Sequence, residues 1–272
     1  MLTGRFFAHF QAEPHFNMGF DEWLLSEAID QPGFIALRVY TWSPGAITFG
    51  YNQRQDSALD WSHLGHTPAI RRVTGGRALY HDPSELTYSV VLNRQGMPVT
   101  DLAGTQAESS RVIAEALVIF LSKLGIDTSY QRNSSPEDAR PSFFHKAPCF
   151  ASAAKWEVVY GQQKMIASAQ RRYAECLLQH GSIKFHGLVA HAALPGLTGE
   201  TRQSVSACSE EQFDKYCTTL RNAFSSRTGI PFQDWKLAEP QNLHLAEAVL
   251  GVKKNPLAQR EIIKRTAVAN SL

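Results

Sequence analysis

Residues 33–93 contain a succession of short β-rich segments interrupted by glycine and proline, and no other feature constrains the fold of this chain as strongly. Apolar side chains at helical spacing flank this succession, at 16–29 before it and at 105–125 after it. The segments themselves read GFIALRVYTW, AITFG, PAIRRVTGG, RALYHD and LTYSVVLN. Strand patterns between amphipathic helices predict an α/β (α+β) fold, in which mixed β-sheets are flanked by helices.

Both flanking helices have recognisable ends. Asn17 is the expected N-cap of the first helix, because its side chain can accept a hydrogen bond from an exposed backbone amide. Gly125 is the expected C-cap of the second helix, which carries one apolar stripe for packing on the core. The stripe consists of Val112, Ile113, Ala116, Leu117, Phe120, Leu121 and Leu124.

The second half of the chain predicts two more strands and then a helical segment. KWEVVYGQQKMIASAQRR (155–172) and ECLLQHGSIKF (175–185) have the composition of consecutive strands, with a glycine turn inside the first run. From about residue 209 onward the apolar pattern turns helical. We therefore expect one domain at 1–205 and a mostly helical C-terminal segment at 206–272 packed on it.

Composition argues against several classes of protein. With 43% hydrophobic and 19% charged residues the chain is typical of a globular protein, and its formal charge of +2 lacks the basic excess of a nucleic-acid-binding surface. The four cysteines form no CxxC pair, which argues against a zinc site or a disulfide scaffold and fits a reducing cytoplasm. The N-terminus lacks the apolar region of a signal peptide, and the longest apolar run, 116–121, is too short to span a membrane. We expect a cytoplasmic protein with no nucleic-acid or membrane partner.

RRVTGGRALYHD, at 71–82, is the densest candidate for a binding site. Two adjacent glycines at a strand end let the backbone approach a ligand closely and offer amide N–H groups to an anion or a carbonyl. Arg71, Arg72 and Arg77 add positive charge, and His81 follows on the next strand. A Gly-Gly hairpin with solvated arginines fits these residues equally well. A P-loop and a dinucleotide-binding fingerprint are excluded, since neither continuation follows the glycines.

Three further positions can carry chemistry or can be purely structural. Cys149 follows a polar, proline-punctuated stretch at 131–148 that predicts a long loop, so it is either a nucleophile or a small buried side chain. Lys164 lies beside a predicted hairpin turn, where an exposed lysine is the ordinary alternative. His180 precedes Gly181 in a predicted strand, where close packing is the ordinary alternative.

Four segments, taken in order, resemble the motifs of the lipoate, octanoate and biotin protein ligase and transferase family: RRVTGGRALYHD, ELTYSVV, GQQKMIASAQRR and LQHGSI. NMGFDEWLL and ITFGYNQ resemble that family's N-terminal helix and the strand after it, so the resemblance covers about residues 15–190. It implies a biotin/lipoate protein ligase-like fold, with the catalytic domain at 1–205 and Lys164 as a catalytic residue. The substrate-binding residues that it implies are Arg72, Thr74, Gly75, Gly76, Ala78, His81, Ser168, Ala169, His180 and Gly181.

Cysteine placement separates the sub-classes of this family. PCF at 148–150 is similar to the loop of the ligase-shaped, cysteine-bearing (LipM-type) octanoyltransferases. ATP-dependent lipoate ligases typically carry an Asn-Asp pair before the lysine hairpin, and 147–159 has none. The shorter octanoyltransferases place their cysteine where Leu177 stands here. Cys176 is one residue away, on the opposite face of the strand, and is therefore expected to be a core residue.

The resemblance implies an octanoyltransferase that needs no cofactor. Octanoyl would move from acyl carrier protein to Cys149 as a thioester, and then to a lysine of a lipoyl domain, for example glycine cleavage H protein. A thioester is already activated, so ATP and Mg are needed only under the ligase alternative. Lys164 would favour the Cys149 thiolate, because a nearby ammonium lowers the pKa of a thiol. Ala167 stands where the family has a glycine, which leaves the acyl-length preference open.

Three other functions stay open at this point. An ATP-dependent lipoate–protein ligase would use the same fold and Lys164, with Cys149 incidental. A non-catalytic acyl- or lipoyl-domain-binding protein would keep the pocket and not need the thiol. A metal-dependent hydrolase would rest on HLGH at 63–66, although the other histidines are scattered and no HExxH motif accompanies them. The sequence does not determine the acceptor protein, the oligomeric state, or whether Cys149 is poised without substrate.

Overall fold

The computed structural model describes residues 2–131, 156–161, 163–194, 201–202 and 206–259 of the chain. A six-stranded sheet in the order β10-β11-β6-β2-β1-β14 forms its centre. The strands are β1 (Gly4–Ala12), β2 (Ile35–Trp42), β6 (Leu86–Asn93), β10 (Ile166–Tyr173), β11 (Cys176–Ile183) and β14 (Phe232–Asp234). Neighbours from β10 to β2 are antiparallel, whereas β1 is parallel to both β2 and β14. The sheet is therefore mixed, as the sequence predicted.

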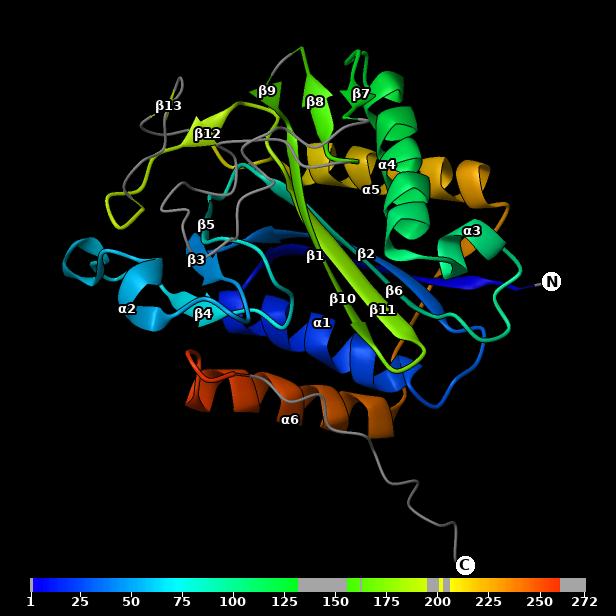
Figure 1. The fold of residues 1–272 in the computed structure, drawn as a ribbon, viewed down its shortest axis with the longest axis horizontal. Coiled ribbons are helices and arrows are strands. Elements are labelled where there is room, and N and C mark those ends of the chain that lie inside the picture. The colour runs from blue at the N-terminus through cyan, green and yellow to red at the C-terminus, as the bar shows by residue number, and fades with distance from the viewer. Residues whose placement is uncertain (1, 132–155, 162, 195–200, 203–205, 260–272) are drawn as a thin grey trace, which may run out of the picture.

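Helices cover both faces of this sheet (Figure 1). Helices α1 (Pro14–Ala28) and α6 (Glu239–Lys254) lie on one face, and α4 (Gln106–Lys123) and α5 (Glu210–Thr228) lie on the other. Alternate residues of each strand point to opposite faces, so the sheet separates two apolar cores. Cys176 and Leu178 of β11 pack with residues of α1, whereas Leu177 packs with residues of α4. Because both faces are covered, β2, β6 and β11 are buried along their whole length.

Within the described residues, the remaining elements form three smaller sheets and several short helices. A three-stranded sheet has the order β4-β3-β5, a second has the order β7-β8-β9, and β12 pairs with β13. Their bounds are β3 (Ala46–Phe49), β4 (Ala69–Arg71), β5 (Leu79–His81), β7 (Ser129–Tyr130), β8 (Val158–Tyr160), β9 (Gln163–Lys164), β12 (Leu188–Val189) and β13 (Thr201–Arg202). The short helices are α2 (Gln55–Ala58), the 3₁₀ turn η1 (Trp61–His63) and α3 (Thr100–Ala103).

The hairpin interpretation of the Gly-Gly segment is wrong. Strands β4 and β5 lie on opposite edges of β3, parallel and antiparallel to it, so the two glycines connect strands that do not pair with each other. Arg71 and Arg72 are buried and not solvated, with 5% and 6% of their surface exposed. The difference arises because β3, which lies earlier in the chain, occupies the place between the two strands.

The expected helix ends are partly confirmed. Helix α4 begins after Thr105 with a capping box and ends at Lys123, with Leu124 as its C-cap; Gly125, the predicted C-cap, follows one residue later with a left-handed φ of 79°. The N-cap prediction for α1 is wrong, because Pro14 starts this helix one turn earlier and the Glu13 carboxylate accepts the Phe16 amide at 3.0 Å. Asn17 is buried inside α1, where its side chain is used for long-range hydrogen bonds.

The C-terminal segment is mostly helical, as predicted. Helix α5 packs on α4, and α6 packs on α1. The sequence did not predict strand β14, which lies between these helices and extends the main sheet beside β1. The division into 1–205 and 206–272 stays a prediction, and residues 260–272 lie outside the described part. Within the described residues, no helix combines the length and apolar character that crossing a membrane requires.

Candidate functional site

A cavity lies between the small β4-β3-β5 sheet and strands β10 and β11 of the main sheet. The empty space in it, including the part that is open to solvent, is about 350 Å³. Of the residues predicted to bind substrate, the lining includes Arg72, His81, Ser168, Ala169, His180 and Gly181. Ala167, the departure from the family's glycine, lines it too. Residues from segments about 100 positions apart therefore meet at one cavity.

His180 is held on both sides of its ring. Its Nδ1 lies 3.0 Å from Asp21 Oδ2, and its Nε2 lies 2.6 Å from the Thr74 hydroxyl. An ionised carboxylate can only accept hydrogen bonds, so Nδ1 carries the proton toward Asp21. The Nε2 of a neutral ring then accepts from Thr74. The predicted site residues Thr74 and His180 are thereby joined directly, and Asp21 sets the orientation of the imidazole.

Asp21 is the centre of a buried polar cluster. Arg38 Nη1 donates to Asp21 Oδ1 at 2.9 Å, and both side chains are almost fully excluded from solvent. Tyr40 and Ser89 donate to the same carboxylate at 2.9 Å each. Burial raises the pKa of Asp21, but the Arg38 guanidinium and the bond from His180 outweigh it and hold the pKa below its ordinary value. Asp21 is therefore an anion that keeps four donors in fixed positions.

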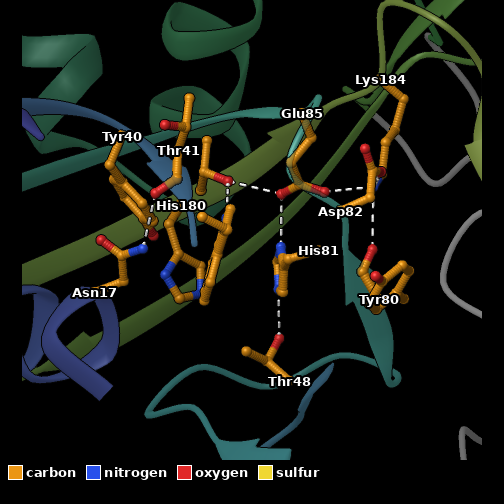
Figure 2. Close-up of polar contacts among 12 residues, drawn as sticks. Asn17, Tyr40, Thr41, Thr48, Tyr80, His81, Asp82, Glu85, His180 and Lys184 are labelled. Atoms are coloured by element: carbon orange, nitrogen blue, oxygen red, sulfur yellow. Dashed lines mark hydrogen bonds and ion pairs between the residues drawn. The ribbon is translucent and has the colours of Figure 1, made fainter. Parts of the chain in front are cut away.

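His81 is held in the same way on the other side of the cavity. Its Nδ1 lies 2.6 Å from Glu85 Oε1 and its Nε2 lies 2.7 Å from the Thr48 hydroxyl. Figure 2 shows both contacts. The ring stacks on Trp42, with the ring centres 4.1 Å apart. Burial lowers the pKa of His81, against the opposing effect of Glu85. Both histidines of the cavity thus stand between a buried carboxylate and a threonine.

Arg72 holds the Gly-Gly segment in shape. Its Nε and Nη2 donate to the carbonyl of Gly75 at 3.1 and 2.7 Å, and Nη2 also donates to the carbonyl of Arg77 at 2.9 Å. Gly76 has a φ of 89°, which a residue with a side chain rarely adopts. Ala78 lies apart from the cavity, in an apolar cluster with Phe49. The sequence predicted Arg72 as a substrate-binding residue and did not predict that it donates to the backbone of its own loop.

The Lys164 side chain is buried, so the interpretation as an exposed hairpin lysine is wrong. Its ammonium lies 2.7 Å from Glu157 Oε2, and the two side chains are 4% and 9% exposed. Glu157 immediately precedes β8, and Lys164 ends β9, so the β8–β9 pairing brings the two together. Lys164 is not among the residues that line the cavity. A buried, paired ammonium at this place is a fixed positive charge near the start of β10.

The predicted nucleophile Cys149 lies outside the described residues. In the described part, burial raises the pKa of each cysteine: that of Cys176 to about 11, that of Cys217 to about 12, and that of Cys208 above its ordinary value. These three side chains are therefore held as thiols, which are poor nucleophiles. Cys176 is fully buried among residues of α1, which confirms the prediction that it is a core residue.

The histidines at 63–66 do not form a metal centre. His63 Nδ1 lies 2.9 Å from Asp60, and both side chains are exposed. Across the described ranges, no three His, Cys, Asp or Glu side chains gather in a way that could hold a metal ion. Nothing in these residues therefore favours the hydrolase alternative.

Several lining residues were not predicted: Met18, Tyr40, Thr48, Leu79, Thr87 and Ser182. The period of a strand could have indicated Ser182, which follows His180 by two positions and so shares its face. Thr87 is directly opposite Ser182 in the antiparallel pair of β6 and β11. Thr48 and Met18 come from distant segments, and no local pattern indicates them.

Gly181 is the position in the cavity wall where a small change should have a clear structural effect. A Cβ added there would stand 2.6 Å from Tyr88 Cε1 and 2.9 Å from the Ala167 carbonyl oxygen. The backbone oxygen cannot move away without shifting β10, so Gly181→Ala should destabilise the protein by about 1–3 kcal/mol in urea unfolding. Gly75→Ala, whose Cβ would meet no atom within 4 Å, is the matched control and should unfold like the parent. Equal stability of both variants would contradict the observed packing of β10 on β11.

Comparison with known proteins gives the family. Residues 13–236 of this chain match the protein family described as "Lipoyl protein ligase A/B catalytic domain". The octanoyltransferase LipM of Kyrpidia tusciae is 38% identical over 187 residues, which is 67% of this chain and 66% of that protein. The octanoyltransferase LipM of Carboxydothermus hydrogenoformans is 38% identical over 186 residues, 67% of this chain and 65% of that protein. The matched part thus spans slightly less than two thirds of these relatives.

Solved structures show the same fold at lower identity. A bi-partite lipoate protein ligase from Thermoplasma acidophilum, described with its E2 lipoyl domain, superimposes with a TM-score of 0.70 at 20% identity, covering 97% of this chain and 100% of that one. Lipoate-protein ligase A bound with ATP gives a TM-score of 0.66 at 21% identity, covering 91% and 94%. The motifs, the mixed sheet and the match over 13–236 agree. The chain belongs to the lipoyl protein ligase A/B catalytic domain family.

Proposed function

We propose that this protein is an octanoyltransferase of lipoate biosynthesis with a cysteine nucleophile. The observation that carries the proposal is the level of identity to curated relatives. The two octanoyltransferases LipM named above are 38% identical over two thirds of the chain, whereas the two lipoate protein ligases of solved structure named above are 20–21% identical and share the fold. PCF at 148–150 and the cavity beside the Gly-Gly segment support the same function.

The first step transfers the acyl group to the enzyme. The Cys149 thiolate attacks the carbonyl carbon of octanoyl carried by acyl carrier protein. A new C–S bond forms, the C–S bond to the donor breaks, and the donor leaves as a thiolate that takes up a proton. Lys164 supplies a fixed positive charge that favours the thiolate form of Cys149 and the oxyanion of the tetrahedral intermediate. No nucleotide is needed, because one thioester replaces another.

The second step releases the product. The neutral amine of a lysine on a lipoyl domain, such as that of glycine cleavage H protein, attacks the acyl-enzyme carbonyl. A C–N bond forms, the C–S bond to Cys149 breaks, and the proton lost from nitrogen returns the sulfur to the thiol. The cavity walls from β10 and β11 hold the acyl chain, while the Gly75–Gly76 backbone, held by Arg72, contributes to the surroundings of the carbonyl. The protein then works in the cytoplasm with no cofactor.

A nucleotide-omission assay tests the proposal. Purified protein, octanoyl-acyl carrier protein and a lipoyl domain should yield octanoylated lipoyl domain in the absence of ATP and Mg, detected as a mass increase of the intact acceptor. A parallel reaction with free octanoate or lipoate plus ATP and Mg should give no product. Product only in the second reaction would replace the proposal with the ligase alternative. Binding of the acyl donor with no product in either reaction would indicate a non-catalytic binding protein.

A further inference from the structure

A buried ion cluster lies directly behind the ring of His81, a predicted substrate-binding residue. The Lys184 ammonium contacts Asp82 Oδ2 at 2.6 Å, the carbonyl of Tyr80 at 3.0 Å, and Glu85 Oε2. The side chains of Lys184, Asp82 and Glu85 are at most 4% exposed. Burial lowers the pKa of Lys184, but the two carboxylates outweigh it and keep the pKa above its ordinary value. Two buried carboxylates thus share one ammonium.

This cluster determines which nitrogen of His81 carries the proton. Burial raises the pKa of Glu85, but Lys184 and His81 outweigh it and hold the pKa at about 2, so Glu85 is ionised at neutral pH. Glu85 Oε1 can then only accept, from His81 Nδ1–H at 2.6 Å and from the Thr87 hydroxyl at 2.7 Å. The Nε2 of the neutral ring is left without a proton and must accept from the Thr48 hydroxyl at 2.7 Å.

Thr48 links the histidine to the Gly-Gly segment. Its Oγ1 accepts a hydrogen bond from Arg72 Nη1 at 3.2 Å while its proton points to His81. The remaining nitrogens of Arg72 hold the carbonyls of Gly75 and Arg77. One continuous chain of contacts therefore runs from Lys184 through Glu85, His81, Thr48 and Arg72 to the backbone of residues 75–77 (Figure 2 shows its first part).

We propose that Lys184 and Glu85 are positioning residues that hold His81 as its neutral Nδ1–H tautomer, and that this tautomer fixes Thr48, Arg72 and the backbone of residues 75–77 at the cavity. The proposal rests on the proposed function only in its activity measurement. If Nε2 gained a proton it would donate to Thr48 Oγ1, and the Thr48 hydroxyl would lose the acceptor that fixes its direction. The arrangement of residues 75–77 then depends on the charges of Lys184 and Glu85, which together set the protonation of His81.

Removing the positive charge of Lys184 and removing the negative charge of Glu85 should shift the pKa of His81 in opposite directions. The charged groups facing the His81 ring are Glu85 after β5, Lys184 after β11 and Arg72 after β4. Lys184→Met removes a cation and leaves two buried carboxylates, so the pKa of His81 should rise and the ring should gain its second proton at a higher pH. Glu85→Gln removes an anion and leaves Lys184 matched with Asp82, so the pKa of His81 should fall.

Nitrogen-15 NMR of histidine side chains tests the tautomer without relying on activity. In the parent protein His81 should show a protonated Nδ1 and an unprotonated Nε2 at neutral pH, with the signal assigned from a His81→Gln sample. Its titration should move to higher pH in Lys184→Met and to lower pH in Glu85→Gln. A protonated Nε2 in the parent, or titrations that shift in the same direction in both variants, would overturn the proposal.

The pH profile of octanoyl transfer is the second readout. Lys184→Met should lose about tenfold to a hundredfold in kcat near pH 6 and recover toward pH 8.5 as His81 loses its proton, because misplacing a binding element has effects of about that size. Arg227→Met removes a cation from Glu115 between α4 and α5, away from the cavity, and should leave the profile unchanged. A uniform loss at every pH in Lys184→Met would overturn the proposal.

If Lys184→Met does not fold, Glu85→Gln and Lys184→Arg decide it, since Lys184→Arg keeps the charge and should keep the parent profile. Absence of transfer by the parent would reject the proposed function and leave the NMR test intact.

Discussion

Octanoyl transfer by the Cys149→Ala variant should fall by about a thousandfold or more, to the uncatalysed background. The proposed mechanism has no other route for the acyl group, because the amine of the acceptor lysine never meets the donor thioester directly. Transfer is measured as octanoylated lipoyl domain by intact-protein mass spectrometry under the nucleotide-free conditions above. The parent protein incubated with donor alone should carry one octanoyl group on the peptide that contains Cys149.

The other cysteines provide the controls. Cys208→Ala and Cys217→Ala should transfer nearly as well as the parent, because burial raises the pKa of both thiols and both residues lie in or before α5. An octanoyl adduct on Cys176, or unreduced transfer by Cys149→Ala, would contradict the nucleophile assignment.

Lys164→Ala should also lose most of its activity, since the positive charge near the thiolate disappears and Glu157 loses the ammonium that it contacts.

The second large effect concerns stability. Arg38→Met should lower the free energy of unfolding by about 3–5 kcal/mol, because it leaves the fully buried Asp21 carboxylate without its cation. The guanidinium also donates to the backbone and side chain of Asn17, so these acceptors lose their donors together. Urea unfolding measures the loss. The double variant Arg38→Met with Asp21→Leu should recover part of it, since replacing a whole buried pair is less harmful than breaking it.

The pH dependence of this effect has a definite sign. The pKa of Asp21 is lower in the folded protein than its ordinary value of 3.8, so the unfolded chain binds the proton more readily. The stability contributed by the pair is fully present above pH 3.8 and is lost as the pH falls through the lower folded value.

Arg54→Met, at the exposed Arg54–Asp56 pair, should leave the unfolding midpoint unchanged. If Arg38→Met lowers the free energy of unfolding no more than Arg54→Met does, the buried Asp21 carboxylate does not need Arg38 for its stability.

Local patterns accounted for most of the secondary structure. The apolar stripe and capping residues of α4 gave its bounds to within two residues, and β-rich composition located β2, β3, β6, β10 and β11. These elements are predictable because their signals lie within a few neighbouring residues. Strand β14 was missed because it has only three residues and lies between two helical segments. Asn17 was misread because a polar residue near a helix start fits a cap as well as a buried partner of Arg38.

The sequence by itself determined the family and the alternation of strands and helices. It did so because ordered motifs and hydrophobic periods are properties of the chain alone. Only the tertiary structure decided that β4 and β5 flank β3, that Lys164 is buried beside Glu157, and that each cavity histidine stands between a carboxylate and a threonine. Asp21 and Lys184 lie about 160 and 100 positions from the residues they hold. Such contacts depend on how the strands are ordered in space, which no local spacing records.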